Sequence, residues 1–232
     1  MNLTSAQLAA ALDSTNLRLD ASAADIVALC EEAAEHRFAC VMIYPASVTL
    51  AASTLQSTGI KIGTVIGFPS GRFSTSAKAA EIDAMQKAGA REVDIVMNYA
   101  ALREGDLTFV DAELRALSKR AHDYGQLVKV IVETCFLDED QRLVALRLCE
   151  DAGAEFIKTS TGFGSAGAKA EHLAAWAAAR RGSIQLKASG GIKTLADARA
   201  LMAVGATRLG TSNAAAILAE LSGGGAAVAG GY

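Results

Sequence analysis

The chain has 232 residues, 51% of them hydrophobic, and a formal net charge of -3 with both signs mixed along the sequence. That balance provides neither the basic field that nucleic acid requires nor a polybasic patch for anionic membranes, so we expect no partner of either kind. The 4 cysteines show no C-x-x-C spacing, which argues against a metal site or a disulfide framework and indicates a reducing compartment such as the cytoplasm. We expect neither a signal peptide nor a membrane span.

The N-terminal segment predicts a short helix over Met1 to Leu12, with Thr4 or Ser5 as its N-cap. The helix runs into the polar cluster Asp13-Ser-Thr-Asn. Taken by itself, Asp13 is interpreted as another helix cap, although Ala10 to Asp13 is also a candidate first strand.

Beyond this segment, helix, turn and strand alternate along the chain. We expect helices over Ser22 to Arg37, Ala46 to Thr58, Ser76 to Ala88, Leu107 to Tyr124, Asp138 to Ala152, Lys169 to Arg180, Leu195 to Val204 and Ala214 to Leu221. We expect strands over Phe38 to Tyr44, Ile60 to Phe68, Glu92 to Met97, Leu127 to Val132, Phe156 to Lys158, Ile184 to Lys187 and Thr207 to Gly210.

Three junctions have similar sequences, each with a helix end, a glycine able to adopt positive φ, and a strand. They are Lys87-Ala-Gly-Ala-Arg-Glu-Val, Asp151-Ala-Gly-Ala-Glu-Phe-Ile and Ala203-Val-Gly-Ala-Thr-Arg-Leu. The alternation predicts an α/β protein with a (β/α)8 TIM-barrel fold. A doubly wound open sheet is the alternative, but the glycine-rich dinucleotide turn typical of it is absent from the sequence. We expect one domain over residues 1–221 and a flexible glycine-rich tail over 222–232.

Charged residues late in the strands are the candidates for chemistry, because barrel enzymes build their sites at the C-terminal strand ends. Five such residues are flanked by aliphatic ones: Asp94, Lys129, Glu133, Lys158 and Lys187. Strand alternation turns Asp94 into the barrel and gives Lys129 and Glu133 one shared parity, for which a structural ion pair is the favoured interpretation.

Lys158, Lys187 and Asp94 converge from separate strands. A buried lysine beside a second cation has a lowered pKa, which suits a nucleophilic amine, and a carboxylate can pass protons through a water. The pattern indicates Schiff-base chemistry on a carbonyl compound, with the roles of the two lysines open in either order.

A phosphate site is indicated separately by two turns. Ser189-Gly190-Gly191 follows the seventh strand and Gly210-Thr211-Ser212-Asn213 follows the eighth, where barrels often bind phosphate through backbone N–H groups and a helix N-terminus.

The chain resembles the deoxyribose-phosphate aldolases, a family of class I aldolases on a TIM barrel. The resemblance is carried by seven motifs in family order: Asp13-Ser-Thr-Asn-Leu, Ile43-Tyr-Pro, Val65-Ile-Gly-Phe-Pro-Ser-Gly, Glu92-Val-Asp-Ile-Val, Lys129-Val-Ile-Val-Glu-Thr, Phe156-Ile-Lys-Thr-Ser-Thr-Gly-Phe and Lys187-Ala-Ser-Gly-Gly-Ile-Lys-Thr.

The resemblance implies that Lys158 forms the Schiff base, that Lys187 perturbs it and that Asp94 belongs to a proton relay. It also implies substrate contacts from Asp13, Thr15, Thr159 and the terminal Tyr232, and phosphate contacts from Gly162, Gly190, Gly191, Gly210 and Ser212.

The reaction implied by the resemblance is reversible cleavage of 2-deoxy-D-ribose 5-phosphate into D-glyceraldehyde 3-phosphate and acetaldehyde, a step of deoxyribonucleotide catabolism, with no cofactor and no metal. Two alternatives are another Schiff-base aldolase or transaldolase-like barrel acting on a different sugar phosphate, and a phosphate-binding barrel without covalent chemistry. Alanine-rich helix faces permit a homodimer.

Overall fold

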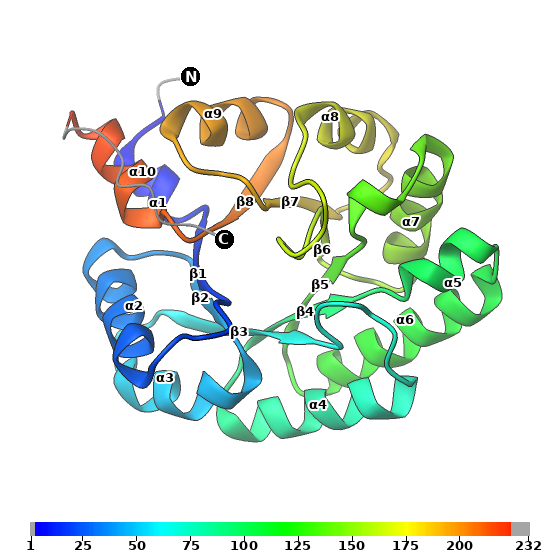
Figure 1. The fold of residues 1–232 in the computed structure, drawn as a ribbon, viewed down its shortest axis with the longest axis horizontal. Coiled ribbons are helices and arrows are strands. Elements are labelled where there is room, and N and C mark those ends of the chain that lie inside the picture. Colours follow the sequence, from blue (N-terminus) through cyan, green and yellow to red (C-terminus); the bar gives the residue numbers. More distant parts are fainter. Residues whose placement is uncertain (1–2, 224–232) are drawn as a thin grey trace.

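Eight parallel strands pair in sequence order and close on themselves, β1 lying beside β8. The computed structural model describes residues 3–223, so Tyr232 and the predicted tail beyond Gly223 lie outside the described residues. The barrel confirms the predicted (β/α)8 fold (Figure 1). The strands are β1 (Leu12–Asn16), β2 (Cys40–Ile43), β3 (Lys61–Ile66), β4 (Glu92–Val96), β5 (Leu127–Ile131), β6 (Phe156–Lys158), β7 (Gln185–Ser189) and β8 (Ala206–Thr211).

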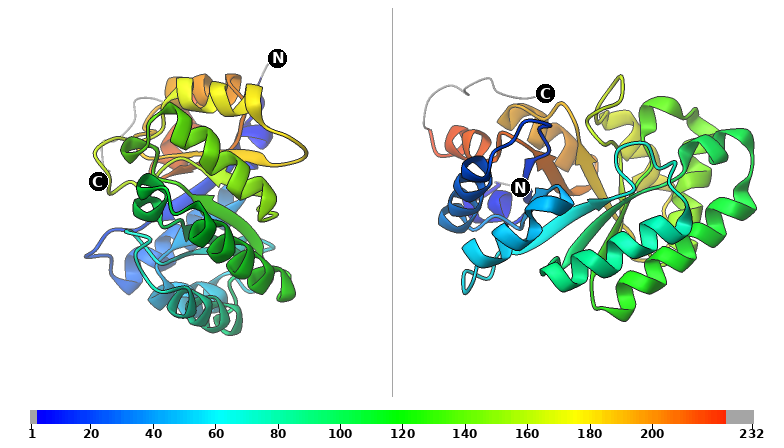
Figure 2. Two further views of the ribbon diagram at one scale, coloured as in Figure 1. Left: turned by 90° about the vertical axis from the view of Figure 1, so that its right-hand side faces the viewer. Right: turned by 60° about the horizontal axis from the view of Figure 1, so that its bottom comes forward.

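Helices surround the barrel on the outside, as the views in Figures 1 and 2 show. Among residues 3–223, none of these helices has the length and apolar character required to cross a membrane. The helices are α1 (Ser5–Ala9), α2 (Ala23–His36), η1 (Pro45–Ser47), α3 (Val48–Thr54), α4 (Thr75–Ala88), α5 (Tyr99–Glu104), α6 (Leu107–Asp123), η2 (Thr134–Phe136), α7 (Glu139–Asp151), α8 (Ala170–Ala179), α9 (Leu195–Ala203) and α10 (Ala214–Leu221).

The N-terminal region differs from the predicted one. Helix α1 begins at Ser5 after a capping box between Thr4 and Gln7, as the N-cap prediction anticipated, but it ends at Ala9. The chain then enters β1, so Asp13 lies within a strand and its interpretation as a helix cap is wrong. The short helix α5, which Asn98 caps, was not predicted.

The glycines at the three similar junctions adopt the expected backbone conformation. Gly89, Gly153 and Gly205 have φ angles of 111°, 75° and 107°. Because L-residues with a side chain rarely adopt such angles, glycine lets each helix end and the chain turn directly into the next strand.

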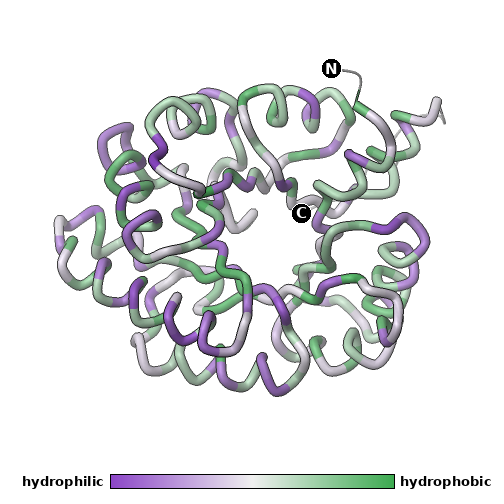
Figure 3. The backbone as a smooth tube through the Cα atoms, turned by 180° about the vertical axis from the view of Figure 1, so that it is seen from behind, coloured by the Kyte–Doolittle hydropathy of each residue, from purple (hydrophilic) through white to green (hydrophobic). Residues whose placement is uncertain are grey.

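The main hydrophobic core lies between the outer faces of the strands and the surrounding helices. Outward-facing residues such as Val93, Ile95 and Val130 are buried there. Figure 3 shows the corresponding alternation of hydrophobic and hydrophilic positions along the peripheral helices. A second, smaller apolar cluster contains Leu17, Cys40, Met42 and Val65.

A fully buried ion pair joins α4 and α6 outside the barrel. Lys78 Nζ lies 2.9 Å from Glu113 Oε2, and neither side chain is exposed to solvent. The same ammonium group donates to the carbonyl oxygen of Val96, at the end of β4. The pair therefore ties two helices to the strand that carries Asp94.

Glu113→Leu should lower the free energy of unfolding by about 3–5 kcal/mol, because it leaves the Lys78 ammonium buried without its carboxylate. Adding Lys78→Met should restore most of that loss, since no unpaired charge remains. Chemical denaturation of the three proteins measures the effect.

The matched control is the ion pair of Lys119 and Asp123 on α6, whose side chains are 75% and 55% exposed. Asp123→Ala should cost at most about 1 kcal/mol. A cost for Glu113→Leu as small as this would contradict the assigned role of the buried pair.

Candidate active site

Asp94 is buried inside the barrel, at the point where three lysines meet. Lys129 Nζ donates to Oδ1 at 2.8 Å, and the Nζ atoms of Lys158 and Lys187 donate to Oδ2 at 2.7 Å and 2.8 Å. Strand register explains the convergence, because Asp94 pairs with Lys129 across β4 and β5, and Lys158 pairs with Lys187 across β6 and β7. The three groups predicted to converge therefore lie in direct contact.

Asp13 is the second carboxylate of this arrangement. It points inward from β1 and is fully buried. Lys187 Nζ lies 2.5 Å from its Oδ2, and Arg208 Nη2 lies 2.7 Å from its Oδ1. Lys187 thus bridges Asp13 and Asp94.

Glu92 is the third carboxylate and completes the arrangement. Lys129 Nζ lies 2.6 Å from Glu92 Oε2, and Arg208 Nη2 lies 2.7 Å from the same atom. A register shift between β7 and β8 places Arg208 opposite Lys187, so that it also faces inward. The guanidinium group lies 5.7 Å from the centre of the Phe156 ring.

These contacts define what we call the barrel network, whose members are Asp13, Glu92, Asp94, Lys129, Lys158, Lys187 and Arg208. Six of them form a closed ring of alternating charge: Asp94, Lys187, Asp13, Arg208, Glu92 and Lys129. Lys158 lies outside the ring and is attached to it through Asp94.

The predicted ion pair between Lys129 and Glu133 is wrong. Strand β5 ends at Ile131, and Glu133 adopts a left-handed backbone conformation with a φ of 54°. Its carboxylate accepts hydrogen bonds from the amide and the hydroxyl of Thr161 instead. Glu133 therefore holds the loop that follows β6, a role that its strand parity did not reveal.

The protonation of Lys158 is set by opposing effects. Burial lowers its pKa, the Asp94 carboxylate raises it and the Lys187 ammonium lowers it again, and the result is a pKa of about 8. For Lys129, burial also lowers the pKa, but Asp94 and Glu92 outweigh it and the net shift is upward. Burial raises the pKa of Asp94, and Lys129 and Lys158 lower it well below its usual range. Lys158 can thus lose its proton near neutral pH while Asp94 stays ionised.

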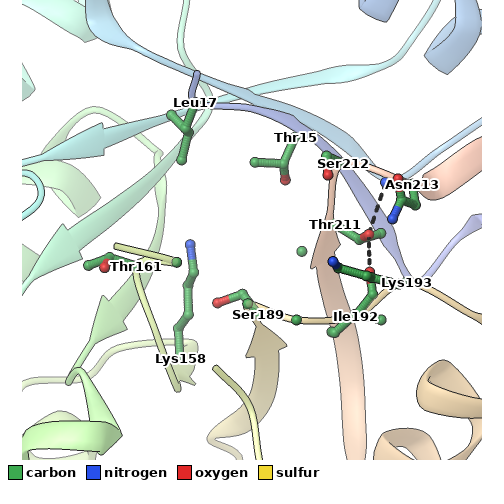
Figure 4. Close-up of a pocket in the computed structure, with 14 residues that line it drawn as sticks. Thr15, Leu17, Lys158, Thr161, Ser189, Ile192, Lys193, Thr211, Ser212 and Asn213 are labelled. Carbon is green, nitrogen blue, oxygen red and sulfur yellow. Dashed lines mark hydrogen bonds between the residues drawn. The ribbon is translucent and has the colours of Figure 1, made fainter. Parts of the chain in front are cut away.

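A pocket opens directly above Lys158 (Figure 4), with about 540 Å³ of space including its opening to solvent. It lies at the C-terminal ends of the strands, between the loops that follow β6, β7 and β8. The predicted site residues that line it are Thr15, Lys158, Gly162, Gly190, Gly191, Gly210 and Ser212. Lys193, which the sequence reasoning did not single out, also lines it.

Hydrogen bonds hold in place the pocket wall formed by the loops after β7 and β8, where the sequence predicted a phosphate site. Thr211 Oγ1 donates to the carbonyl of Ile192 at 2.7 Å and accepts from the amide of Asn213 at 3.0 Å, as Figure 4 shows. Among the described residues, the Asn213 side chain accepts no hydrogen bond from the first turn of α10. Asn213, the N-cap of α10, lines the pocket, so the N-terminus of this helix lies at the pocket wall. Its positive end has no side-chain cap from the described residues.

The remaining predicted residues are placed differently. Asp13, Asp94 and Lys187 lie beneath the pocket in the barrel network and do not line it. Thr159 is fully buried, and its hydroxyl donates to the carbonyl of Ser189 and accepts from the Ser189 amide. It joins β6 to β7, away from the pocket lining.

A possible metal-ligand set also lies in the barrel. Donor atoms of Asp13, Cys40 and Glu92 lie within 4.8 Å of one another. Both carboxylates already accept from Arg208, and Glu92 also accepts from Lys129. A metal ion there would meet two fixed cations, so these residues do not fit a metal.

Comparison with known proteins identifies the family. The sequence model of a family described as "DeoC/LacD family aldolase" matches residues 7–219. The chain belongs to this aldolase family. A member from Aciduliprofundum boonei named deoxyribose-phosphate aldolase is 42% identical over 93% of this chain and 97% of its own.

Solved structures of family members have the same fold. The crystal structure of a putative deoxyribose-phosphate aldolase from Coccidioides immitis matches with a TM-score of 0.91 and 37% identity, over 94% of this chain and 87% of that one. A deoxyribose phosphate aldolase from Aeropyrum pernix, described as having a unique tetrameric structure, matches with a TM-score of 0.89 and 30% identity, over 94% and 92% of the two chains.

Lys187→Leu should raise the pKa of Lys158 above its value of about 8. The substitution removes a cation beside the Lys158 ammonium and leaves Asp94 less neutralised, and both changes favour the charged amine. The rate at which a small amine-reactive reagent modifies Lys158, followed by mass spectrometry across pH, reports the midpoint. Modification of the exposed Lys61 in the same samples monitors the reagent. An unchanged midpoint would remove the perturbing role of Lys187.

Proposed function

We propose that this protein is a deoxyribose-phosphate aldolase that uses Lys158 as its Schiff-base nucleophile. The reaction is the reversible cleavage of 2-deoxy-D-ribose 5-phosphate into D-glyceraldehyde 3-phosphate and acetaldehyde. The observation that carries the proposal is the position of Lys158, which pairs with Asp94 below and opens into the pocket above. The names of the family members in the comparison support the choice of substrate.

The reaction begins at the amine. Neutral Lys158 adds to the C1 aldehyde of the open-chain sugar, and loss of water gives an imine. A pKa of about 8 leaves a usable neutral fraction at pH 7 to 8. Protonation of the imine nitrogen makes it an electron sink for the next step.

Cleavage of the C2–C3 bond follows in the imine that the sugar has formed with Lys158. The C3 hydroxyl loses its proton, the C2–C3 bond breaks, and its electron pair moves through C2 to the imine nitrogen. The C3 fragment leaves as D-glyceraldehyde 3-phosphate, and the enamine that stays on Lys158 takes a proton at C2. Water hydrolyses the imine and releases acetaldehyde. We assign the proton transfers to Asp94 and Lys187, acting through a water.

The phosphate end of the substrate fits the opposite wall of the pocket. Backbone N–H groups near Gly162, Gly190, Gly191 and Gly210, the Ser212 side chain and the N-terminus of α10 are the proposed ligands. Lys193 supplies a positive charge on the same wall. Local dipoles of this kind hold a phosphate on a protein whose net charge is -3.

Other contacts complete the proposal. Thr15 lines the pocket beside the sugar, whereas Asp13 acts through Lys187, which it holds at 2.5 Å. The predicted contact of Tyr232 lies outside the described residues, and Thr159 stays a predicted substrate contact. The chemistry balances without a metal or an organic cofactor. We further propose a cytoplasmic protein of deoxyribonucleotide catabolism that assembles as a homodimer.

Borohydride reduction during turnover of 2-deoxyribose 5-phosphate should trap an adduct on Lys158, because hydride reduces the imine to a stable secondary amine. Peptide mapping by mass spectrometry locates it. Lys158→Leu should abolish both the adduct and cleavage, with the circular dichroism spectrum unchanged.

Each alternative has its own outcome in this experiment. An adduct on Lys187 would move the nucleophile to that residue. Trapping on Lys158 with other sugar phosphates but not with this one would indicate a different aldolase. Phosphate binding with no adduct at all would indicate a barrel without covalent chemistry, and would overturn the proposal.

A further inference from the structure

Glu92, Lys129 and Arg208 extend from the strands toward the barrel end opposite the pocket, and they do not line it. We propose that these three are positioning residues, which set the charge on Lys158 through Asp94 and Lys187 and so control the cleavage reaction. The inference rests on the proposed function for its meaning in catalysis, but its electrostatic part is tested without cleavage.

The placement of these residues follows from barrel geometry. In a (β/α)8 barrel, alternate strands contribute side chains to successive interior layers. The even strands supply a deep layer formed by Cys40, Glu92, Phe156 and Arg208. The usual occupants of such a layer are bulky aliphatic residues. Here Arg208 instead spans the interior from β8 to Glu92 on β4.

The number of partners distinguishes Lys158 from the other cations. Within the barrel network, Lys129 pairs with Glu92 and Asp94, Lys187 pairs with Asp13 and Asp94, and Arg208 pairs with Asp13 and Glu92. Among the described residues, Lys158 pairs with Asp94 alone, which it shares with two other ammonium groups. Removing a proton from Lys158 therefore breaks one ion pair, whereas removing one from any other cation of the network breaks two.

The overall charge of the network favours the same proton. Four cations (Lys129, Lys158, Lys187 and Arg208) face three carboxylates (Asp13, Glu92 and Asp94), so the fully charged network has one positive charge in excess. In a buried site, an uncompensated charge is costly. Loss of one proton from Lys158 makes the network neutral.

Among the described residues, two other ionisable groups, Cys40 and Glu133, lie near the network without forming an ion pair with it. Burial raises the pKa of the Cys40 thiol well above its usual range, and Glu92 and Asp13 raise it further, so the thiol stays neutral. Burial also raises the pKa of Glu133, while the hydrogen bonds from Thr161 and the charge of Lys158 lower it. Glu133 thus also faces Lys158, but among the described residues the ion pair of Lys158 is with Asp94, a member of the ring.

Ring closure is what Glu92, Lys129 and Arg208 contribute. Arg208 and Glu92 connect Asp13 to Lys129, so each ring cation keeps two carboxylate partners. Burial by itself lowers the pKa of Arg208, but Asp13 and Glu92 outweigh it and the net shift is upward. The one excess positive charge of the network therefore falls on Lys158, which has a single carboxylate partner among the described residues.

The experiment removes charges of opposite sign from neighbouring positions. Glu92→Gln deletes a negative charge, whereas Lys129→Gln and Arg208→Gln each delete a positive one, and glutamine retains hydrogen-bonding capacity in all three. The acid limb of the pH profile of kcat/KM reports the loss of the proton from Lys158 in the free enzyme. The full-length protein and 2-deoxyribose 5-phosphate are used throughout.

Glu92→Gln should move this limb to lower pH by about one unit, and Lys129→Gln should move it to higher pH by about one unit. Arg208→Gln, two contacts further along the ring than Lys129, should move the limb in the same direction as Lys129→Gln by a smaller amount. The double variant Glu92→Gln/Lys129→Gln, in which the charge balance is restored, should return close to wild type. Glu31→Gln, an exposed carboxylate on α2, should leave the limb in place.

A purely structural role would not produce shifts of opposite sign. Limbs that stay at the wild-type pH, that move in the same direction for Glu92→Gln and Lys129→Gln, or that fail to return in the double variant would overturn the inference.

Variants that cleave too slowly are measured by the pH dependence of Lys158 modification with a small amine-reactive reagent. The same opposite shifts are expected there, and their absence overturns the inference equally. If the wild type does not cleave 2-deoxyribose 5-phosphate, the proposed function fails, but the modification midpoints still decide whether the network sets the charge of Lys158.

Discussion

The site depends on one buried carboxylate that three lysines share. Asp94 accepts from Lys129, Lys158 and Lys187 at 2.7 to 2.8 Å, with no exposure to solvent. An isolated carboxylate could not remain ionised at such a position, and three isolated ammonium groups could not remain charged. Each charge is stable because the others are present. The reactive amine is therefore a property of the group of residues, and no single lysine has it by itself.

The barrel separates the elements that stabilise the fold from those that carry the chemistry. Apolar burial is concentrated between the outer strand faces and the helices, while much of the interior is given to charged side chains. Because a buried ion pair is a weak source of net stability, replacing the interior charges with aliphatic residues would not be expected to unfold the protein. Their retention is explained by chemistry: a rigid scaffold holds opposing charges so close that one proton is easily lost.

Sequence reasoning predicted what depends on local pattern. The strand around Asp94 alternates cleanly, so its inward direction and its meeting with Lys158 and Lys187 were predictable, as were the glycine turns of the pocket. The partners of Asp13 and Lys129 were not, because Asp13 was interpreted as a helix cap and strand parity assigned Lys129 to Glu133. Arg208 contacts Glu92 across 116 residues and faces inward next to a register shift that no periodicity reveals. Parity also failed for Glu133, which lies past the end of its strand.

The central claim is that Lys158, and not Lys187, is the amine that loses its proton. Neutron diffraction from deuterium-exchanged crystals grown at about pH 9, above the pKa of about 8, shows the protons directly. The account predicts two deuterons on Lys158 Nζ and three on the Nζ atoms of Lys129 and Lys187. Three deuterons on Lys158 together with two on Lys187 would contradict it.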